Sequence, residues 1–217
     1  MKRHLLLRFL PALFLSIIML HDSNAQVLTG IEVLAGRDFD LLKGKRVGLV
    51  TNPTGVDRSL RSTIDILHEH VNLVALFGPE HGVRGDYSAG DHVGDQVDAQ
   101  TGIPVFSLYG SNRKPSAEAL DLLDVLVYDI QDIGVRSYTY ISTMGLVMEA
   151  AAEMDKEVIV LDRPNPLGGI RVEGPLVEDG FHSFVSQYSI PYVYGLTCGE
   201  LALMLNGEGM LEDGRQC

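Results

Sequence analysis

Residues 72–82 read Asn-Leu-Val-Ala-Leu-Phe-Gly-Pro-Glu-His-Gly, and this stretch decides how the chain can fold. The apolar run Leu73–Phe77 has the length and composition of a strand that is buried on both faces, as in a sheet covered by helices. Gly78 and Pro79 then favour an abrupt turn, because glycine tolerates unusual backbone angles and proline fixes φ. Glu80 should therefore project from the carboxyl end of a central strand, where open α/β sheets bind their ligands.

The rest of the chain repeats this pattern, because apolar runs of strand length alternate with segments of helical period. Such alternation is typical of βαβ units. The sequence therefore predicts an α/β fold with a Rossmann-like open, mostly parallel sheet and helices on both faces. The expected strands are Arg46–Thr51, Asn72–Phe77, Pro104–Leu108, Val125–Ile130 and Glu157–Leu161, and the expected helices are Ser59–His70, Ala117–Leu123, Ser142–Asp155 and Thr197–Asn206.

The pattern changes after the fifth expected strand. Glycine and proline pairs flank a short run at Ile170–Glu173, and a second run follows at Tyr188–Tyr194. We expect a small β excursion in this part of the chain. The last expected helix then begins from Thr197, whose side chain is a suitable helix cap.

The first 25 residues have the composition of a secretory signal peptide. Basic residues precede an apolar run, and small residues that suit cleavage follow it: Lys2, Arg3 and Arg8, then Phe9–Leu20, then Ser23-Asn24-Ala25. The apolar run is shorter than the roughly 20 residues that span a membrane, so we expect no stable membrane span. The mature protein would begin near Gln26, lie in the periplasm or outside the cell, and form one Rossmann-like domain over residues 26–217.

The net charge of the chain argues against nucleic acid as a partner. The chain has a formal net charge of −12, and loss of the first 25 residues, with three basic residues and one acidic residue, would leave −14. We therefore expect no nucleic-acid partner, because phosphate backbones repel such a surface. Cys198 and Cys217 do not make a disulfide framework, and Cys198 has no His or Cys nearby at metal-ligand spacing.

Polar residues directly follow each expected strand, and the carboxyl ends of parallel strands meet at one edge of the sheet. Several of them have purely structural alternatives, since Asn beside proline is a common turn former and an Asp can cap a helix. For Glu80 a purely structural role is the hardest to support, because a carboxylate in a tight glycine-proline turn adds little to stability. The catalytic candidates are Glu80, Asp129 and Asp132. The candidates for substrate binding are Asn52, His81, Arg84, Gln131, Arg136, Tyr138, Arg163 and Asn165.

The sequence gives little support for a metal or a cofactor. A possible metal cluster and a possible calcium loop, Gly85–Asp98, match no ordered ligand spacing; the cluster would consist of His81, Asp86, Asp91, His92 and Asp95. No dinucleotide-binding glycine motif follows the first expected strand, and no Gly-x-Ser-x-Gly elbow is present. We expect neither a cofactor nor a bound metal.

With metal, dinucleotide and serine-nucleophile chemistry set aside, acid–base catalysis by carboxylates remains. Glycoside hydrolysis is a reaction of this kind. That reaction needs one carboxylic acid, kept protonated in a dry pocket, to protonate the leaving oxygen, and a second group to stabilise or attack the sugar cation. Glu80 suits the first role, and Asp129 or Asp132 could supply the second. A substrate with a 2-acetamido group could instead use its own carbonyl oxygen as the nucleophile.

These residues lie in five stretches that resemble the NamZ-like exo-β-N-acetylmuramidases, a bacterial family once known only as a domain of unknown function. The resemblance extends from Gly30 to about Gly209. The stretches are Gly48–Gly55, Phe77–Gly85, Val127–Tyr140, Leu161–Gly169 and Glu173–Pro175. The resemblance implies an exported glycosidase with a Rossmann-like first domain, which removes terminal N-acetylmuramic acid from the non-reducing end of peptidoglycan fragments.

The resemblance also implies roles for single residues. Glu80 corresponds to the catalytic acid, while the second group stays open among Asp129, Asp132 and Tyr138. The lactyl carboxylate of the muramic sugar needs a cation, which the three candidate arginines Arg84, Arg136 or Arg163 could provide through paired hydrogen bonds. The expected partner is a muropeptide or disaccharide derived from peptidoglycan.

The family's members look longer, with a further C-terminal domain, so the chain resembles the first domain alone. Pocket walls from that second domain would be absent, and we expect weak turnover or none from the chain by itself. Two other functions stay open at this point. One is a periplasmic module that binds a wall sugar without cleaving it, and the other is a metal-dependent amidase or deacetylase that acts on wall peptides.

Overall fold

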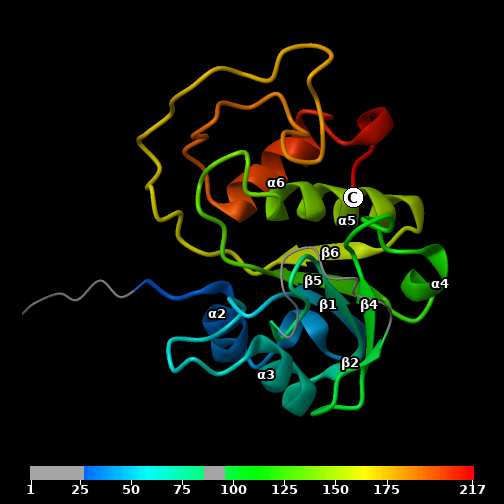
Figure 1. The fold of residues 1–217 in the computed structure, drawn as a ribbon. Helices are drawn as coiled ribbons and strands as arrows, with labels where there is room; N and C mark the ends of the chain where they lie inside the picture. The colour runs from blue at the N-terminus through cyan, green and yellow to red at the C-terminus, as the bar shows by residue number, and fades with distance from the viewer. Residues whose placement is uncertain (1–26, 86–95) are drawn as a thin grey trace, which may run out of the picture.

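The computed structural model describes residues 27–85 and 96–217 (Figure 1). The expected signal peptide lies outside the described residues. So do four members of the possible metal cluster, Asp86, Asp91, His92 and Asp95. Within the described ranges, no helix is both long and apolar enough to cross a membrane.

A six-stranded sheet in the order β3-β4-β2-β1-β5-β6 forms the centre of the molecule. Five strands are parallel, and only the short edge strand β3 is antiparallel to its neighbour. β1 lies between β2 and β5, so the strands that follow it in sequence are added first on its β2 side and later on its β5 side. This reversal of strand order creates the topological switch point of a doubly wound fold. The strands are β1 (Arg46–Thr51), β2 (Asn72–Gly78), β3 (Gln96–Val97), β4 (Pro104–Ser107), β5 (Val125–Asp129) and β6 (Glu157–Val160).

Helices cover both faces of this sheet. Figure 1 shows α5 and α6 on one face and α2 and α3 on the other. Two helices begin at the caps that their sequences offer: the Ser62 hydroxyl accepts from the Ile64 amide, and Thr197 forms a capping box with Glu200. The helices are α2 (Gly30–Gly36), α3 (Thr63–His70), α4 (Ala117–Leu120), α5 (Tyr140–Glu153) and α6 (Cys198–Gly207), with 3₁₀ turns η1 (Asp40–Leu42) and η2 (Glu212–Gly214).

Two apolar cores follow from the alternation of side chains along the strands. Val47 and Leu49 of β1 belong to the core beneath α2 and α3, whereas Val50 belongs to the core beneath α5 and α6. Gly48 faces the second core, where a Cβ atom would come within 2.5 Å of the Leu123 side chain. The sheet is therefore buried on both sides, as its uninterrupted apolar runs predict.

The expected elements are present with small differences in their bounds. Helix α3 begins four residues later than expected, because the Asp57 carboxylate accepts from the Ser59 and Arg61 amides and holds a turn there. Helix α2 was not expected, since its seven residues bury only two apolar side chains, Ile31 and Leu34. Strand β3 was also missed, because two exposed residues carry no apolar pattern.

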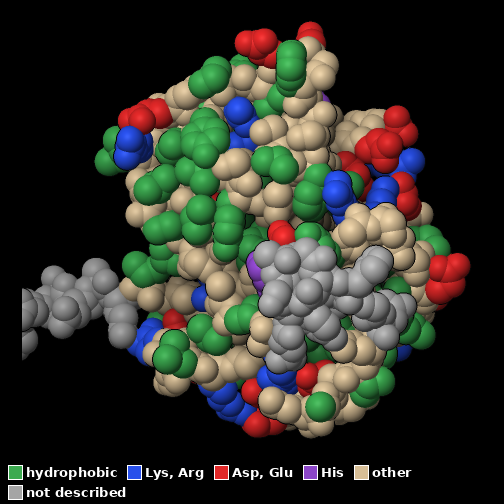
Figure 2. Space-filling model, viewed as in Figure 1, with side chains coloured by type: hydrophobic (Ala, Val, Ile, Leu, Met, Phe, Trp, Pro, Cys, Tyr) green, Lys and Arg blue, Asp and Glu red, His purple; other side chains and the backbone are tan. Residues whose placement is uncertain are grey.

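The chain between β6 and α6 is a long coil. The expected β excursion is reduced there to single bridges, in which Val193 pairs with Glu173 and with Val135. Figure 2 shows hydrophobic side chains gathered over this coil, and Ile170 and Phe181 are among the most exposed of them. Few backbone hydrogen bonds hold the coil, so hydrogen bonds made by side chains fix its conformation.

Candidate active site

The polar residues that follow the strands lie at one edge of the sheet, as expected for parallel strands. Strands β2 and β4 end side by side, because Gly78 pairs with Ser107 and the Leu108 amide donates to the Gly78 carbonyl at 2.8 Å. The loops after these two strands therefore start as neighbours. The loops after β1 and β5 are neighbours in the same way, since Thr51 pairs with Asp129.

Glu80 lies in a tight turn directly after β2. The turn closes with a hydrogen bond from the Gly82 amide to the Pro79 carbonyl at 2.9 Å, and His81 and Gly82 both have positive φ. This left-handed backbone is unusual for histidine. The half-buried Glu80 carboxylate accepts a hydrogen bond through Oε1 from the Tyr109 hydroxyl at 2.9 Å. Glu80 is thus oriented by a phenol from the loop after β4.

Two further tyrosines lie beside Glu80. The Tyr140 hydroxyl, at the start of α5, donates to the Glu80 carbonyl at 3.4 Å, and its ring meets Tyr138 edge to face at 4.8 Å between centroids. Burial raises the pKa of Tyr138 and Tyr140, and the Asn52 amide beside Tyr140 only partly offsets this for Tyr140. The hydrogen bond to Glu80 raises the pKa of Tyr109. All three phenols therefore stay neutral and can act as hydrogen-bond donors.

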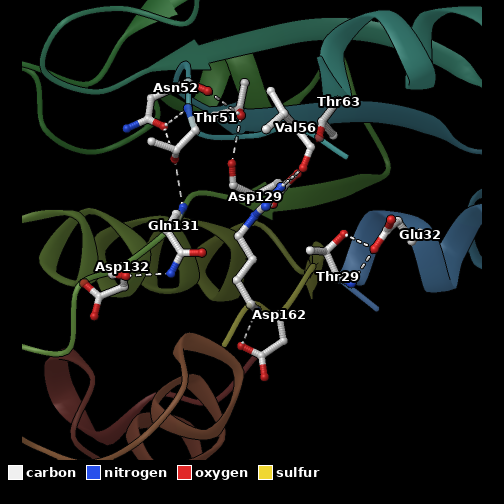
Figure 3. Close-up of polar contacts among 12 residues, drawn as sticks. Thr29, Glu32, Thr51, Asn52, Val56, Thr63, Asp129, Gln131, Asp132 and Asp162 are labelled. Atoms are coloured by element: carbon white, nitrogen blue, oxygen red, sulfur yellow. Dashed lines mark hydrogen bonds and ion pairs between the residues drawn. The ribbon is translucent and has the colours of Figure 1, made fainter. Parts of the chain in front are cut away.

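Asp129, at the end of β5, is fully buried in an ion pair with Arg163 (Figure 3). Arg163 donates through Nε to Oδ1 at 2.6 Å and through a terminal nitrogen to Oδ2 at 3.0 Å. The Thr63 hydroxyl donates to the same carboxylate, and Arg163 also donates to the Val56 carbonyl at 2.9 Å. These contacts join β5 and the loop after β6 to the segment before α3, so the pair acts as a structural link.

Asp132 is buried beneath the coil that precedes α6. Its Oδ2 accepts from the Gly134 amide at 2.6 Å and from the Tyr194 hydroxyl, and burial raises its pKa. Oδ1 is buried and has no hydrogen-bond partner among the described residues. In Figure 3 the Asp132 carboxyl group points away from Asn52 and Asp129. Asp132 therefore anchors the coil and does not cap α5, which begins only at Tyr140.

The other two candidate arginines are also engaged in structural contacts. Arg84 forms ion pairs with Asp98 at 2.6 Å and with Asp65 of α3 at 2.9 Å. The buried Arg136 donates to the carbonyls of Pro175 and Ile190 and to the Ser186 hydroxyl, and it thereby fixes the coil. Sequence reasoning could not see these partners, because most of them lie far along the chain.

The candidate amides bind backbone or neighbouring groups. Asn52 accepts from the Thr54 amide at 2.9 Å, and Gln131 donates to the Asp132 and Pro164 carbonyls. Asn165 accepts from the Leu167 amide and donates to the Leu196 carbonyl, both at 2.8 Å. Asn52 and Asn165 thus take the turn-forming role that their neighbouring prolines suggest.

Glu80 lies at the same edge of the sheet as three of the other candidates, Asp129, Arg136 and Arg163. Within the described ranges, no hydrogen bond or ion pair joins Glu80 to any of the three, and its side-chain partner is Tyr109. Tyr109 and Tyr140 are the site residues that sequence reasoning missed. Tyr109 does follow β4 directly, and this position was the available signal.

Several hollows are lined wholly by described residues. One lies between η1 and the end of α3, and another lies between α5, β6 and α6. The second contains Asp162, whose carboxylate accepts from the Thr197 hydroxyl and the Gly199 amide and so caps α6. Neither hollow contains Glu80 or one of its tyrosines.

Comparison with known proteins gives one consistent result. The chain matches the family model described as "Exo-beta-N-acetylmuramidase NamZ, N-terminal" over residues 47–215. It is 55% identical over 185 residues to the Bacillus subtilis (strain 168) protein named peptidoglycan beta-N-acetylmuramidase NamZ, and the match covers 84% of this chain and 45% of that protein.

Two crystal structures of DUF1343 family proteins from Bacteroides fragilis share the fold. The first has a TM-score of 0.81 and 68% identity, and the match covers 88% of this chain and 48% of that chain. The second has a TM-score of 0.75 and 39% identity, and covers 89% and 50%, respectively. The chain therefore spans about half the length of these relatives.

Proposed function

The chain belongs to the NamZ N-terminal family, and from this premise we propose that it acts as an exo-β-N-acetylmuramidase. The reaction would remove β-linked N-acetylmuramic acid from the non-reducing end of peptidoglycan fragments. The name of the Bacillus subtilis relative, a peptidoglycan beta-N-acetylmuramidase, supports the substrate class. The arrangement around Glu80 supports the chemistry.

The observation that carries this proposal is the hydrogen bond between Tyr109 and Glu80. A neutral phenol holds Oε1, and no described residue forms an ion pair with the carboxyl group. Among the described residues, no hydrogen bond is made to Oε2. A general acid needs this arrangement, because one oxygen must be fixed while the other carries the proton to the leaving group.

Neither Asp129 nor Asp132 supplies the second catalytic group in this proposal. Asp129 neutralises a buried arginine, and Asp132 turns toward Tyr194 and Gly134. Tyr138 stays a neutral donor, because burial raises its pKa. The acetamido oxygen of the substrate is then the nucleophile, and Tyr138 is a candidate to orient that group.

The steps balance with these groups alone. Glu80 gives its proton to the glycosidic oxygen while the bond from that oxygen to C1 breaks and the acetamido oxygen bonds to C1. Water then attacks C1, its proton returns to Glu80, and the bond to the acetamido oxygen breaks. The configuration at C1 is retained, because each attack inverts it once.

A paired assay tests the proposal. We expect the chain by itself to hydrolyse weakly a β-N-acetylmuraminide whose leaving group needs a proton, and Glu80→Gln to abolish this release while its affinity for N-acetylmuramic acid stays close to wild type. Wild-type affinity for the sugar with no turnover to lose would identify a binding module. Turnover that a chelator abolishes would identify a metal-dependent hydrolase, and either result would contradict the proposal.

Export of the chain is part of the proposal and has its own test. The basic and apolar residues of the first 25 positions support it. N-terminal sequencing of protein from the periplasm or medium should give a first residue near Gln26. Recovery of the intact chain with Met1 from the cytoplasm alone would contradict export.

A further inference from the structure

Almost every cation among the described residues already has a partner. Each described lysine and arginine except Arg113 bonds a carboxylate or a backbone carbonyl. Arg113 has neither kind of partner within residues 27–85 and 96–217. The chain is strongly acidic, so an exposed arginine without a carboxylate partner needs an explanation.

Arg113 is held in place by a different contact. Its guanidinium carbon lies 4.4 Å from the centroid of the half-buried Phe184 ring. Stacking of this kind covers one planar face of the guanidinium and leaves the N–H edge free. That edge has the geometry to bind both oxygens of a carboxylate at once.

Arg113 also lies beside the proposed catalytic group. It belongs to the loop after β4, four residues beyond Tyr109, whose hydroxyl binds Glu80 at 2.9 Å. The positive charge of Arg113 partly offsets the rise in the pKa of Tyr109, so the guanidinium lies within electrostatic range of the phenol. Glu80 and Arg113 therefore lie in two neighbouring loops, after β2 and β4, and Tyr109 of the second loop joins the two loops through its bond to Glu80.

The proposed substrate carries one anionic group on the sugar itself. N-acetylmuramic acid differs from N-acetylglucosamine by a lactyl ether at C3, which ends in a carboxylate. Because C3 lies two ring carbons from the reacting C1, the matching cation should lie next to the catalytic acid and not on it. Arg113 suits this requirement, because it lies four residues beyond Tyr109, whose hydroxyl binds Glu80.

Resting on the proposed function, we propose that Arg113, stacked on Phe184, binds the lactyl carboxylate and so selects muramic over glucosamine substrates. The three arginines expected for this task would each have to give up existing contacts. Arg163 would leave the buried Asp129 without its partner, which is costly in a protein interior. Arg113 would give up no bond to any described residue.

Direct binding tests the proposal without turnover. By calorimetry, the wild-type chain should bind N-acetylmuramic acid about 10- to 100-fold more tightly than N-acetylglucosamine, as for a hydrogen-bonded charge pair. The methyl ester of the lactyl group should bind as weakly as N-acetylglucosamine. Equal affinity of the wild-type chain for the acid and its ester would overturn the proposal.

Variants then test which residue causes the preference for the acid over its ester. Arg113→Ala should bind the acid and the ester equally, and Arg113→Lys should restore part of the preference, because a lysine keeps the charge but lacks the paired donors. Phe184→Leu should reduce the preference by less than Arg113→Ala does. Arg37→Ala is the matched control, because Arg37 is an exposed arginine next to α2 that pairs with Asp40.

The outcomes separate this proposal from the proposed function. Hydrolysis of a muraminide with no loss of preference in Arg113→Ala would overturn the role of Arg113 and leave the function standing. A preference for the acid that Arg113→Ala removes, without any hydrolysis, would support Arg113 and contradict the enzyme.

Discussion

The two halves of the carboxyl edge of the sheet differ in how their polar groups are used. On the β5 and β6 side, Asp129 and Arg163 satisfy each other in a buried ion pair, with further bonds from Thr63 and to Val56. On the β2 and β4 side, the Glu80 side chain has one phenol as its partner within residues 27–85 and 96–217. Charged groups that are fully paired stabilise a fold, whereas groups with free hydrogen-bonding capacity can meet a substrate.

The difference teaches that a motif rich in polar residues is not by itself a catalytic site. The stretch around Asp129 to Tyr138 is the longest of the polar stretches, yet Asp129, Asp132 and Arg136 all hold parts of the chain together. In the shorter stretch around Glu80, the carboxylate accepts from the Tyr109 hydroxyl and forms no ion pair with a described residue.

The largest expected effect is on turnover. Glu80→Gln should lower the rate of muraminide hydrolysis by about 10²–10⁴-fold, which is the usual contribution of a general acid. Its free energy of unfolding should change by less than about 0.5 kcal/mol, because Tyr109 can still bind the side-chain amide oxygen. Denaturant unfolding on the same preparation checks the second part. A large loss of stability would place Glu80 among the structural residues and break the comparison.

Asp129→Asn should have its main effect on stability. The substitution leaves Arg163 buried without a counter-charge, and we expect a loss of about 3–5 kcal/mol in the free energy of unfolding. Thermal unfolding should show a drop of about 2–4 °C for each kcal/mol. The double variant Asp129→Leu with Arg163→Met is the control, and it should recover much of the loss. An Asp129→Asn protein of unchanged stability would contradict the structural role.

The pair of Arg84 with Asp98 gives a smaller effect that depends on pH. The Arg84 guanidinium lowers the pKa of Asp98 from 3.8 to about 2. Because the folded-state pKa lies below the unfolded one, the pair contributes stability above about pH 3.8 and loses it as the pH falls toward 2. Asp98→Asn should therefore cost about 1–3 kcal/mol at pH 7 and much less at pH 2. A cost that does not change between these pH values would contradict this ion pair.

The smallest expected effect concerns the hydrogen bond from Tyr109 to Glu80 at the ends of β2 and β4. Tyr109→Phe removes the donor to Glu80 and should lower turnover by about five- to tenfold, as for one hydrogen bond. Stability should stay near wild type, since the phenol is only half-buried. Tyr138→Phe is the comparison variant, because Tyr138 forms no hydrogen bond to Glu80 among the described contacts and its ring packs against Tyr140. Unchanged kinetics in Tyr109→Phe would show that Glu80 does not depend on this contact.

Most of the fold could be predicted from the sequence, because buried parallel strands leave uninterrupted apolar runs. The runs at Val125–Asp129 and Glu157–Val160 are examples, and both are strands within a residue of the expected bounds. Short elements such as α2 could not be predicted, because seven residues show too little of the helical period.

The site was predictable only in part. The position of Glu80 after a central strand could be derived from its turn, but its partner Tyr109 is 29 residues away in the sequence. The roles of the arginines could not be derived, since a free arginine and a paired one look alike in a sequence. Their partners depend on the fold: Arg163 and Asp129 are 34 residues apart, and Arg136 and Ile190 are 54 residues apart.

The most direct test of the central claim compares two leaving groups with wild type and Glu80→Gln at equal folded concentrations. The account predicts that Glu80→Gln hydrolyses a muramic disaccharide at least about 100-fold more slowly than wild type, but keeps most of the wild-type kcat/KM on a dinitrophenyl muraminide, whose leaving group needs no proton. Equal losses on both substrates, or no loss on either, would contradict Glu80 as the acid.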